Sequence, residues 1–157
     1  MKETKIYIVG SGAIGKALAV FLQQENKEVV LVRGSVDNIP DSEDEITLIG
    51  KDQIFHQKII TTTFSGLQAI NGIVLIATKA FANTEIAAKL KDKDGDFSIV
   101  LLQNGLHVES PFQEFDKVYR CVLFSTSQVT GDNEVTFKSV TSSPVGNLQG
   151  NNDCLED

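Results

Sequence analysis

Three glycines near the N-terminus, Gly10, Gly12 and Gly15, have the spacing Gly-x-Gly-x-x-Gly and carry the clearest chemical signal in the sequence. In such a loop the first glycine permits a tight turn, the second lets a pyrophosphate approach the backbone, and the third lets a helix pack closely on a strand. The N-terminus of that helix would offer free N–H groups to phosphate oxygens. We predict a dinucleotide-binding loop, although an ordinary turn between strand and helix is the alternative. The expected cofactor-binding residues of the loop are Gly10, Ser11, Gly12, Ala13, Ile14 and Gly15.

Arg33 is the candidate residue for recognising the 2′ substituent of the dinucleotide ribose. It follows an apolar run over 28–32, precedes Gly34 and Ser35, and has no carboxylate beside it in the sequence. At the end of the second strand, an acidic side chain hydrogen-bonds the 2′-hydroxyl of NAD, whereas an arginine accommodates the 2′-phosphate of NADP. The guanidinium fork suits phosphate geometry. The sequence therefore favours NADP over NAD, and the alternative is a solvated arginine that pairs with Asp37.

Two further polar residues follow apolar runs, and each is a candidate ligand-binding residue. Lys79 follows the run over 73–77, and Asn104 follows the run over 98–102. Ligands of open α/β sheets collect at the carboxyl ends of strands, and a carboxamide can both donate and accept hydrogen bonds. We therefore expect both residues near the ligand. The alternatives are a lysine that snorkels at a strand end and an asparagine that only forms a turn with Gly105.

Alternating strands and helices must position these residues. Continuous apolar runs predict buried parallel strands over 6–9, 28–32, 73–77 and 98–102. Helical spacing predicts helices over 16–22 and 84–90, with Asn83 or Thr84 as the N-cap of the second. A polar loop over 36–45 leads to a predicted hairpin, with strands over 46–49 and 55–60, that is appended to the sheet.

From residue 118 the pattern changes to short runs, some of which alternate. The expected strands cover 118–124, 134–140 and 143–146, with a turn over 131–133. We interpret them as antiparallel or mixed strands that close one edge of the sheet. The predicted fold class is α/β: a Rossmann-like dinucleotide-binding fold whose largely parallel sheet is flanked by helices, with antiparallel strands at one edge. We expect one NADP-binding domain over 1–147 and a polar tail over 148–157.

Composition limits the classes of function. The chain has 157 residues, 41% apolar residues and a formal net charge of −7, which suits one well-packed domain and argues against a nucleic-acid surface. It shows neither a signal-peptide pattern nor an apolar run of membrane-spanning length, so we expect a cytoplasmic protein without membrane contact. Cys121 and Cys154 are expected to be free thiols, not a disulfide or metal site. His56 is expected to have no chemical role.

Four motifs, in this order, together resemble the ketopantoate reductase family: GSGAIG at 10–15, VRG at 32–34, ATKA at 77–80 and LLQNG at 101–105. The resemblance covers nearly the whole chain and implies NADPH-dependent reduction of a 2-oxo acid, as in the conversion of 2-dehydropantoate to pantoate in pantothenate biosynthesis. It implies that the glycine loop holds the pyrophosphate and that Arg33 holds the 2′-phosphate. Lys79 and Asn104 would lie near the nicotinamide ribose and the substrate, with Asn104 as a substrate contact. A backbone contact is expected near Val129.

Members of the resembled family also have a second, helical domain, which supplies the general-acid lysine. We expect that domain to be absent from this chain, so that the chain has no catalytic residue and shows little turnover unless a separate helical domain is supplied. The expected partner is a second copy of the chain, in a homodimer, or such a helical domain. Two other functions stay open at this point. One is a stand-alone module that binds or senses NADP(H), and the other is the cofactor domain of a related hydroxyacid dehydrogenase.

Overall fold

The computed structural model describes residues 3–148, so the predicted tail lies, apart from Leu148, outside the described residues. The strands are β1 (Ile6–Val9), β2 (Val29–Arg33), β3 (Ser42–Ile49), β4 (Ile54–Thr63), β5 (Gly72–Ile76), β6 (Phe97–Leu101), β7 (Val118–Cys121), β8 (Ser125–Gly131), β9 (Glu134–Ser139) and β10 (Val145–Asn147). The helices are α1 (Ala13–Gln24) and α2 (Asn83–Lys91). Short 3-10 turns are η1 (Phe64–Gly66), η2 (Ala80–Ala82) and η3 (Ser110–Phe112).

All of these strands join one sheet, in the order β10-β7-β6-β5-β1-β2-β4-β3-β9-β8. From β7 to β4 every neighbouring pair is parallel. At the centre, Val9 of β1 is in register with Val32 of β2 and with Ile76 of β5. The order of the strands reverses at β1, because β2 lies on one side of it and β5 on the other. The predicted α/β fold with a largely parallel core is confirmed.

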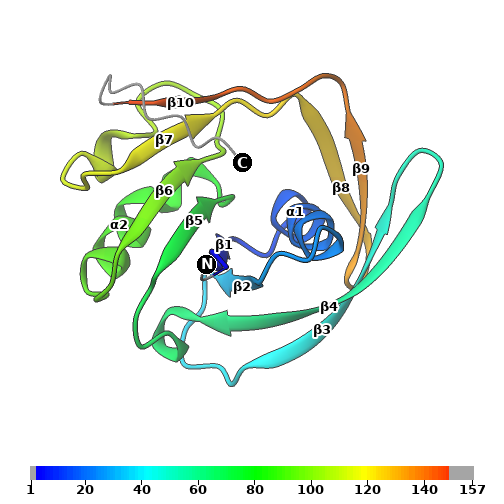
Figure 1. Ribbon diagram of the computed structural model, residues 1–157, viewed down its shortest axis with the longest axis horizontal. Helices are drawn as coiled ribbons and strands as arrows, with labels where there is room; N and C mark the ends of the chain where they lie inside the picture. Colours follow the sequence, from blue (N-terminus) through cyan, green and yellow to red (C-terminus); the bar gives the residue numbers. More distant parts are fainter. Residues whose placement is uncertain (1–2, 149–157) are drawn as a thin grey trace.

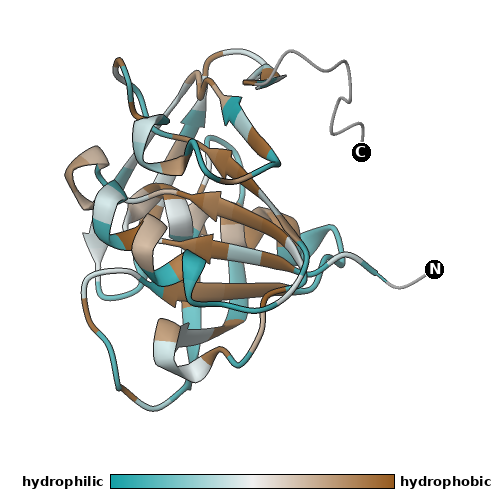
Figure 2. Ribbon diagram, turned by 90° about the vertical axis from the view of Figure 1, so that its left-hand side faces the viewer, coloured by the Kyte–Doolittle hydropathy of each residue, from teal (hydrophilic) through white to brown (hydrophobic). Residues whose placement is uncertain are grey.

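The sheet curves around α1, while α2 covers its outer face beside β5 and β6 (Figure 1). Side chains alternate along β1, so that Ile8 belongs to the core beneath α1 together with Leu31, whereas Val9 belongs to the core beneath α2 together with Leu90. Strands buried on both faces need apolar residues at every position. Several of the central strands are accordingly coloured as hydrophobic along most of their length in Figure 2.

Phe21 on α1 anchors the edge of the sheet that contains β9. Its ring packs edge-to-face against Phe55 of β4 and Phe137 of β9, with centroid distances of 5.8 and 5.0 Å. These contacts bring strands from two distant parts of the chain onto one face of α1. Aromatic burial of this kind adds packing energy beyond the area removed from water.

The sequence predicts one edge with antiparallel strands, but the structure has antiparallel pairs at both edges. β7 continues the parallel core by pairing with β6, and β10 then pairs antiparallel with β7. At the opposite edge β9 pairs parallel with β3, and β8, which the sequence analysis did not predict, pairs antiparallel with β9. Alternation of apolar and polar residues indicates a strand but does not determine which strand it pairs with. Here the packing of β9 on α1 accompanies its pairing with β3, at the edge opposite to β7.

Two local predictions are also corrected. β3 begins at Ser42, inside the segment predicted as a loop over 36–45, because its backbone pairs with β4 as far as Thr61. The N-cap of α2 is Ala82, and no side chain caps the helix. Asn83 is instead the first residue of α2, and its buried side chain donates hydrogen bonds to Gln103 and Val108.

Candidate functional site

The glycine loop joins the carboxyl end of β1 to the start of α1. Gly10 has a φ of +116°, and a Cβ there would lie 2.9 Å from the backbone nitrogen of Thr78. A Cβ at Gly15 would lie 1.8 Å from the carbonyl oxygen of Gly10, so α1 packs directly on the loop. Gly12 is the exposed N-cap of α1, and a Cβ there would meet no described atom within 4 Å. The contacts explain the turn and packing roles of Gly10 and Gly15, whereas the role of Gly12 toward a pyrophosphate stays a prediction.

A pocket of about 370 Å³ lies at the carboxyl ends of β5 and β6. It is lined by Ala13, Ile14, Ala77, Thr78, Lys79, Ala80, Leu102, Gln103, Asn104, Leu123, Ser125 and Ser127. Four of the predicted site residues therefore meet here: Ala13, Ile14, Lys79 and Asn104. Lys79 and Asn104 are exposed, and within residues 3–148 neither side chain forms a hydrogen bond or ion pair. Both are available to a ligand.

A buried amide pair joins the two strand ends behind the pocket. Nδ2 of Asn83 donates to Oε1 of Gln103 at 2.7 Å, and Nε2 of Gln103 donates to Oδ1 of Asn83 at 2.6 Å. Gln103 also donates to the carbonyl oxygen of Thr78 at 2.8 Å, and Asn83 donates to that of Val108 at 2.9 Å. The pair thereby ties the segment after β5 to the segment after β6. The sequence analysis did not predict this amide pair. The signal for it in the sequence is Gln103, a polar residue directly after an apolar run.

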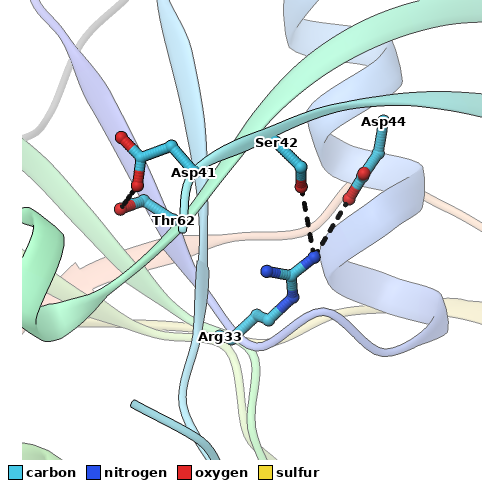
Figure 3. A network of polar contacts seen from close by, with 5 residues as sticks. All are labelled: Arg33, Asp41, Ser42, Asp44 and Thr62. Atoms are coloured by element: carbon cyan, nitrogen blue, oxygen red, sulfur yellow. Dashed lines mark hydrogen bonds and ion pairs between the residues drawn. The ribbon is translucent and has the colours of Figure 1, made fainter. Parts of the chain in front are cut away.

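Arg33 does not line this pocket, because it lies on β2, across β1 from β5. Its guanidinium reaches over β4 to β3 (Figure 3), where Nη2 donates to Oγ of Ser42 at 3.3 Å and lies 3.5 Å from Oδ2 of Asp44. Nη1 is buried and has no hydrogen-bond partner among the described residues. The alternative of a solvated arginine paired with Asp37 is wrong, since the side chain is only 23% exposed and its partner is Asp44.

Asp37 instead organises the loop after β2. Its Oδ1 accepts hydrogen bonds from the backbone N–H of Ser65 at 2.9 Å and from the backbone N–H of Asn38 at 2.9 Å. These donors, above all the backbone N–H and then the hydroxyl of Ser65, hold the pKa of Asp37 well below its ordinary value. The carboxylate therefore fastens the loop after β2 to η1.

β8 supplies a wall of the pocket that sequence reasoning did not find. Ser125 and Ser127 lie two residues apart on this strand, and both line the pocket. Oγ of Ser127 donates to the carbonyl oxygen of Thr136 at 2.7 Å, whereas Oγ of Ser125 is buried without a hydrogen-bond partner in the described chain. Val129, near which a backbone contact is expected, lies farther along β8 and does not line the pocket.

The remaining residues singled out in the sequence lie away from the pocket. Nδ1 of His56 is 3.0 Å from Oγ1 of Thr47, across the β3–β4 pair. Cys121 is a free thiol in β7 whose pKa is raised by burial, and Cys154 lies outside the described residues. Within residues 3–148, no helix has the length and apolar character needed to cross a membrane.

The residues present fit a dinucleotide. The first N–H groups of an α-helix have no partner inside the helix, and α1 presents them beside the open space at Gly12. The partly exposed guanidinium of Arg33 lies on one side of β1, and the pocket with Lys79 and Asn104 lies on the other side. An extended ligand that crosses the carboxyl end of β1 would contact all three regions.

Comparisons with known proteins bear on the family and the fold of the chain. Residues 6–150 match the family model described as ketopantoate reductase PanE/ApbA. D-mandelate dehydrogenase, in its ternary structure with NADH and anilino(oxo)acetate, has a TM-score of 0.75 and 20% identity over 92% of this chain and 49% of that chain. A 2-dehydropantoate 2-reductase from Geobacter metallireducens has a TM-score of 0.74 and 20% identity over 91% of this chain and 49% of that one. A comparison with curated proteins found no match.

A dimeric ketopantoate reductase from Staphylococcus aureus has a TM-score of 0.64 and 23% identity, over 84% of this chain and 47% of that chain. At these identities the likeness shows the fold, which is Rossmann-like. The chain spans about half the length of the solved structures that it matches.

Proposed function

Because the chain belongs to the ketopantoate reductase family, we propose that it is the NADP(H)-binding domain of an oxidoreductase that reduces a 2-oxo acid. The observation that carries the proposal is the pocket where Ala13 and Ile14 of the glycine loop meet Lys79 and Asn104. In open α/β sheets, ligands bind at the carboxyl ends of strands where the strand order reverses. The substrate that we propose first is 2-dehydropantoate, whose reduction to pantoate belongs to pantothenate biosynthesis.

The chemistry of each side chain suggests its part in binding. The N–H groups at the start of α1 would bind the pyrophosphate, and Arg33 would bind the 2′-phosphate. The ammonium of Lys79 and the carboxamide of Asn104 have no other partner in the described chain and would bind the nicotinamide ribose and the oxo acid. A bound nicotinamide cofactor would supply the hydride.

Reduction of a ketone also needs a proton donor. Lys79 is the one ionisable side chain among the described residues that line the pocket. We propose that the acid comes instead from a helical domain, and a positioned acid contributes about 10²- to 10⁴-fold to the rate. NADPH oxidation with ketopantoate, with and without such a domain supplied in trans, tests this. Full turnover by the chain alone would assign the acid to Lys79.

A second candidate is the cofactor domain of an NADH-dependent hydroxyacid dehydrogenase. The observation that favours it is the ion pair between Arg33 and Asp44, because it puts a carboxylate where the 2′-phosphate would bind. D-mandelate dehydrogenase, which has a similar fold, is described with NADH. For either candidate the cytoplasm is the proposed location.

Calorimetric titration with NADPH and NADH tests the proposed cofactor. We expect NADPH to bind more tightly, and we expect Arg33→Ala to remove that preference by weakening NADPH about 10- to 150-fold, the equivalent of one charge-assisted contact of ~1.5–3 kcal/mol. Lys58→Ala is the matched control, since Lys58 is 67% exposed and pairs only with Glu43 in the described chain. Equal affinities of the two cofactors for the parent chain would contradict the assignment of Arg33.

A further inference from the structure

Asp44 holds a carboxylate against the arginine to which the proposed function assigns the 2′-phosphate. We propose that Asp44 is an internal counter-ion of Arg33 that determines selectivity between a 2′-phosphate and a 2′-hydroxyl, because a phosphate has to displace its carboxylate. The inference rests on the proposed function and adds to it a second residue for cofactor choice. This carboxylate does not belong to a residue at the end of β2. It belongs to Asp44 on β3, which lies two strands away from β2 in the sheet.

The geometry of the Arg33–Asp44 ion pair would allow a phosphate to displace the carboxylate. Ser42 and Asp44 lie two residues apart on β3 and so share a face, and both engage the same nitrogen, Nη2 of Arg33 (Figure 3). Nη2 of Arg33 lies 3.5 Å from Oδ2 of Asp44, and the side chains of Arg33 and Asp44 are each 23% exposed. Guanidinium and carboxylate bind most strongly through two parallel hydrogen bonds, and here Nη1 has no hydrogen-bond partner in the described chain. The Arg33–Asp44 pair therefore lacks the second hydrogen bond of a bidentate pair, and a phosphate that binds Nη2 would have to displace the carboxylate.

The other carboxylates near the start of β3 are engaged elsewhere. Asp41 accepts a hydrogen bond from Oγ1 of Thr62 at 2.5 Å, as Figure 3 shows. Glu43 alternates to the opposite face from Asp44 and pairs with Lys58 at 3.7 Å. Among the described residues, Asp44 is thus the carboxylate that pairs with Arg33.

The two cofactors would respond to Asp44 in opposite ways. A 2′-phosphate bound at Arg33 would place its negative charge beside this carboxylate, and like charges at close range repel. A 2′-hydroxyl can instead donate a hydrogen bond to a carboxylate, which is how acidic residues accept NAD. Asp44 should therefore weaken NADPH binding and either support or leave unchanged NADH binding.

The test compares the parent chain with Asp44→Asn, which keeps the shape of the side chain and removes its charge. Affinities for NADPH and NADH are measured by calorimetry at one low salt concentration, because salt screens ion pairs. We expect NADPH to bind about 3- to 5-fold more tightly to the variant, the upper part of the range for exposed ion pairs, while NADH binds equally or more weakly. Titration with 2′,5′-ADP and 5′-AMP should show the same difference at the ribose end alone.

Two further variants serve as controls for Asp44→Asn. Glu43→Gln makes the same chemical change one residue away on the other face and should leave the ratio of affinities within ~2-fold. Ser42→Ala removes the other partner of Nη2 but keeps the carboxylate, so it should not shift the ratio toward NADPH. An unchanged ratio in Asp44→Asn, or an equal shift in Glu43→Gln, would overturn the inference while the proposed function stands. Absence of binding of either dinucleotide to the folded parent chain would overturn both.

Discussion

Substitution of Gly12 by valine separates binding of a ligand from folding of the chain. The backbone at Gly12 has φ of −78° and ψ of −170°, which any residue can adopt, and a Cβ there meets no described atom within 4 Å. Valine is a poorer N-cap than glycine, so we expect a loss of at most about 1 kcal/mol in the free energy of unfolding. The added methyl groups would occupy the space in which the pyrophosphate is proposed to bind. Loss of even one charge-assisted hydrogen bond there would weaken NADPH binding by ~10- to 150-fold.

Substitution of Gly15, in the same loop, should instead lower the stability of the fold. A single added Cβ would lie 1.8 Å from the carbonyl oxygen of Gly10, and the backbone on both sides is fixed by β1 and α1. Overpacking usually costs about 1–3 kcal/mol, and a clash with backbone falls at or beyond the upper end of that range. At ~2–4 °C per kcal/mol for a chain of this size, Gly15→Ala should lower Tm by roughly 6–12 °C.

The assay combines urea unfolding and thermal unfolding with calorimetric titration of NADPH on the same preparations. Gly146→Val is the matched control for Gly12→Val, because a Cβ at Gly146 of β10 also meets no described atom within 4 Å but lies outside the glycine loop. The control should bind NADPH as the parent chain does. If folded Gly12→Val bound NADPH with parental affinity, the glycine loop would be only a turn, and the reasoning about the pyrophosphate would be refuted.

The remaining predictions concern stability. Asn83→Ala should lower the free energy of unfolding, measured in urea, by about 2–4 kcal/mol, because it leaves buried acceptors on Gln103 and Val108 without their donor. A loss under ~1 kcal/mol would show that the amide pair does not hold the segments after β5 and β6 together. Asp37 has a lowered pKa in the folded state because Ser65 donates to it, so its carboxylate stabilises the fold above its unfolded pKa of ~3.9, and this stabilisation is lost as pH falls toward the folded pKa. Asp37→Ala should therefore be less stable than the parent chain at neutral pH, with a difference that shrinks in acid. A difference independent of pH would contradict the assignment.

The sequence predicts the centre of the fold well, since the strands on both sides of β1 are continuous apolar runs. Their carboxyl ends locate Lys79 and Asn104 without knowledge of the structure, and the pocket brings these two residues together. The glycine spacing likewise predicts a turn and a close helix contact, which the φ of Gly10 and the burial of Gly15 explain.

The sequence does not predict features that depend on distant partners. β9 pairs with β3, far from it in the chain, and the packing of Phe137 on Phe21 of α1 accompanies that choice. Alternation along the strand contains no information about it. The partner of Arg33 is hidden for the same reason, because Asp44 comes close only when β3 and β4 pair and the arginine reaches over β4.

Titration of the ¹⁵N-labelled chain with NADPH, followed by backbone amide NMR, tests the central claim most directly. A dinucleotide that crosses the carboxyl end of β1 should shift the amides of Gly12, Arg33, Lys79 and Asn104 in one saturable process. Amides of the β3–β4 turn, such as Gly50, belong neither to the glycine loop nor to the pocket lining and serve as the internal control. Absence of shifts, or shifts confined to residues outside the glycine loop and the pocket, would contradict the proposal that this chain binds NADP(H) at that site.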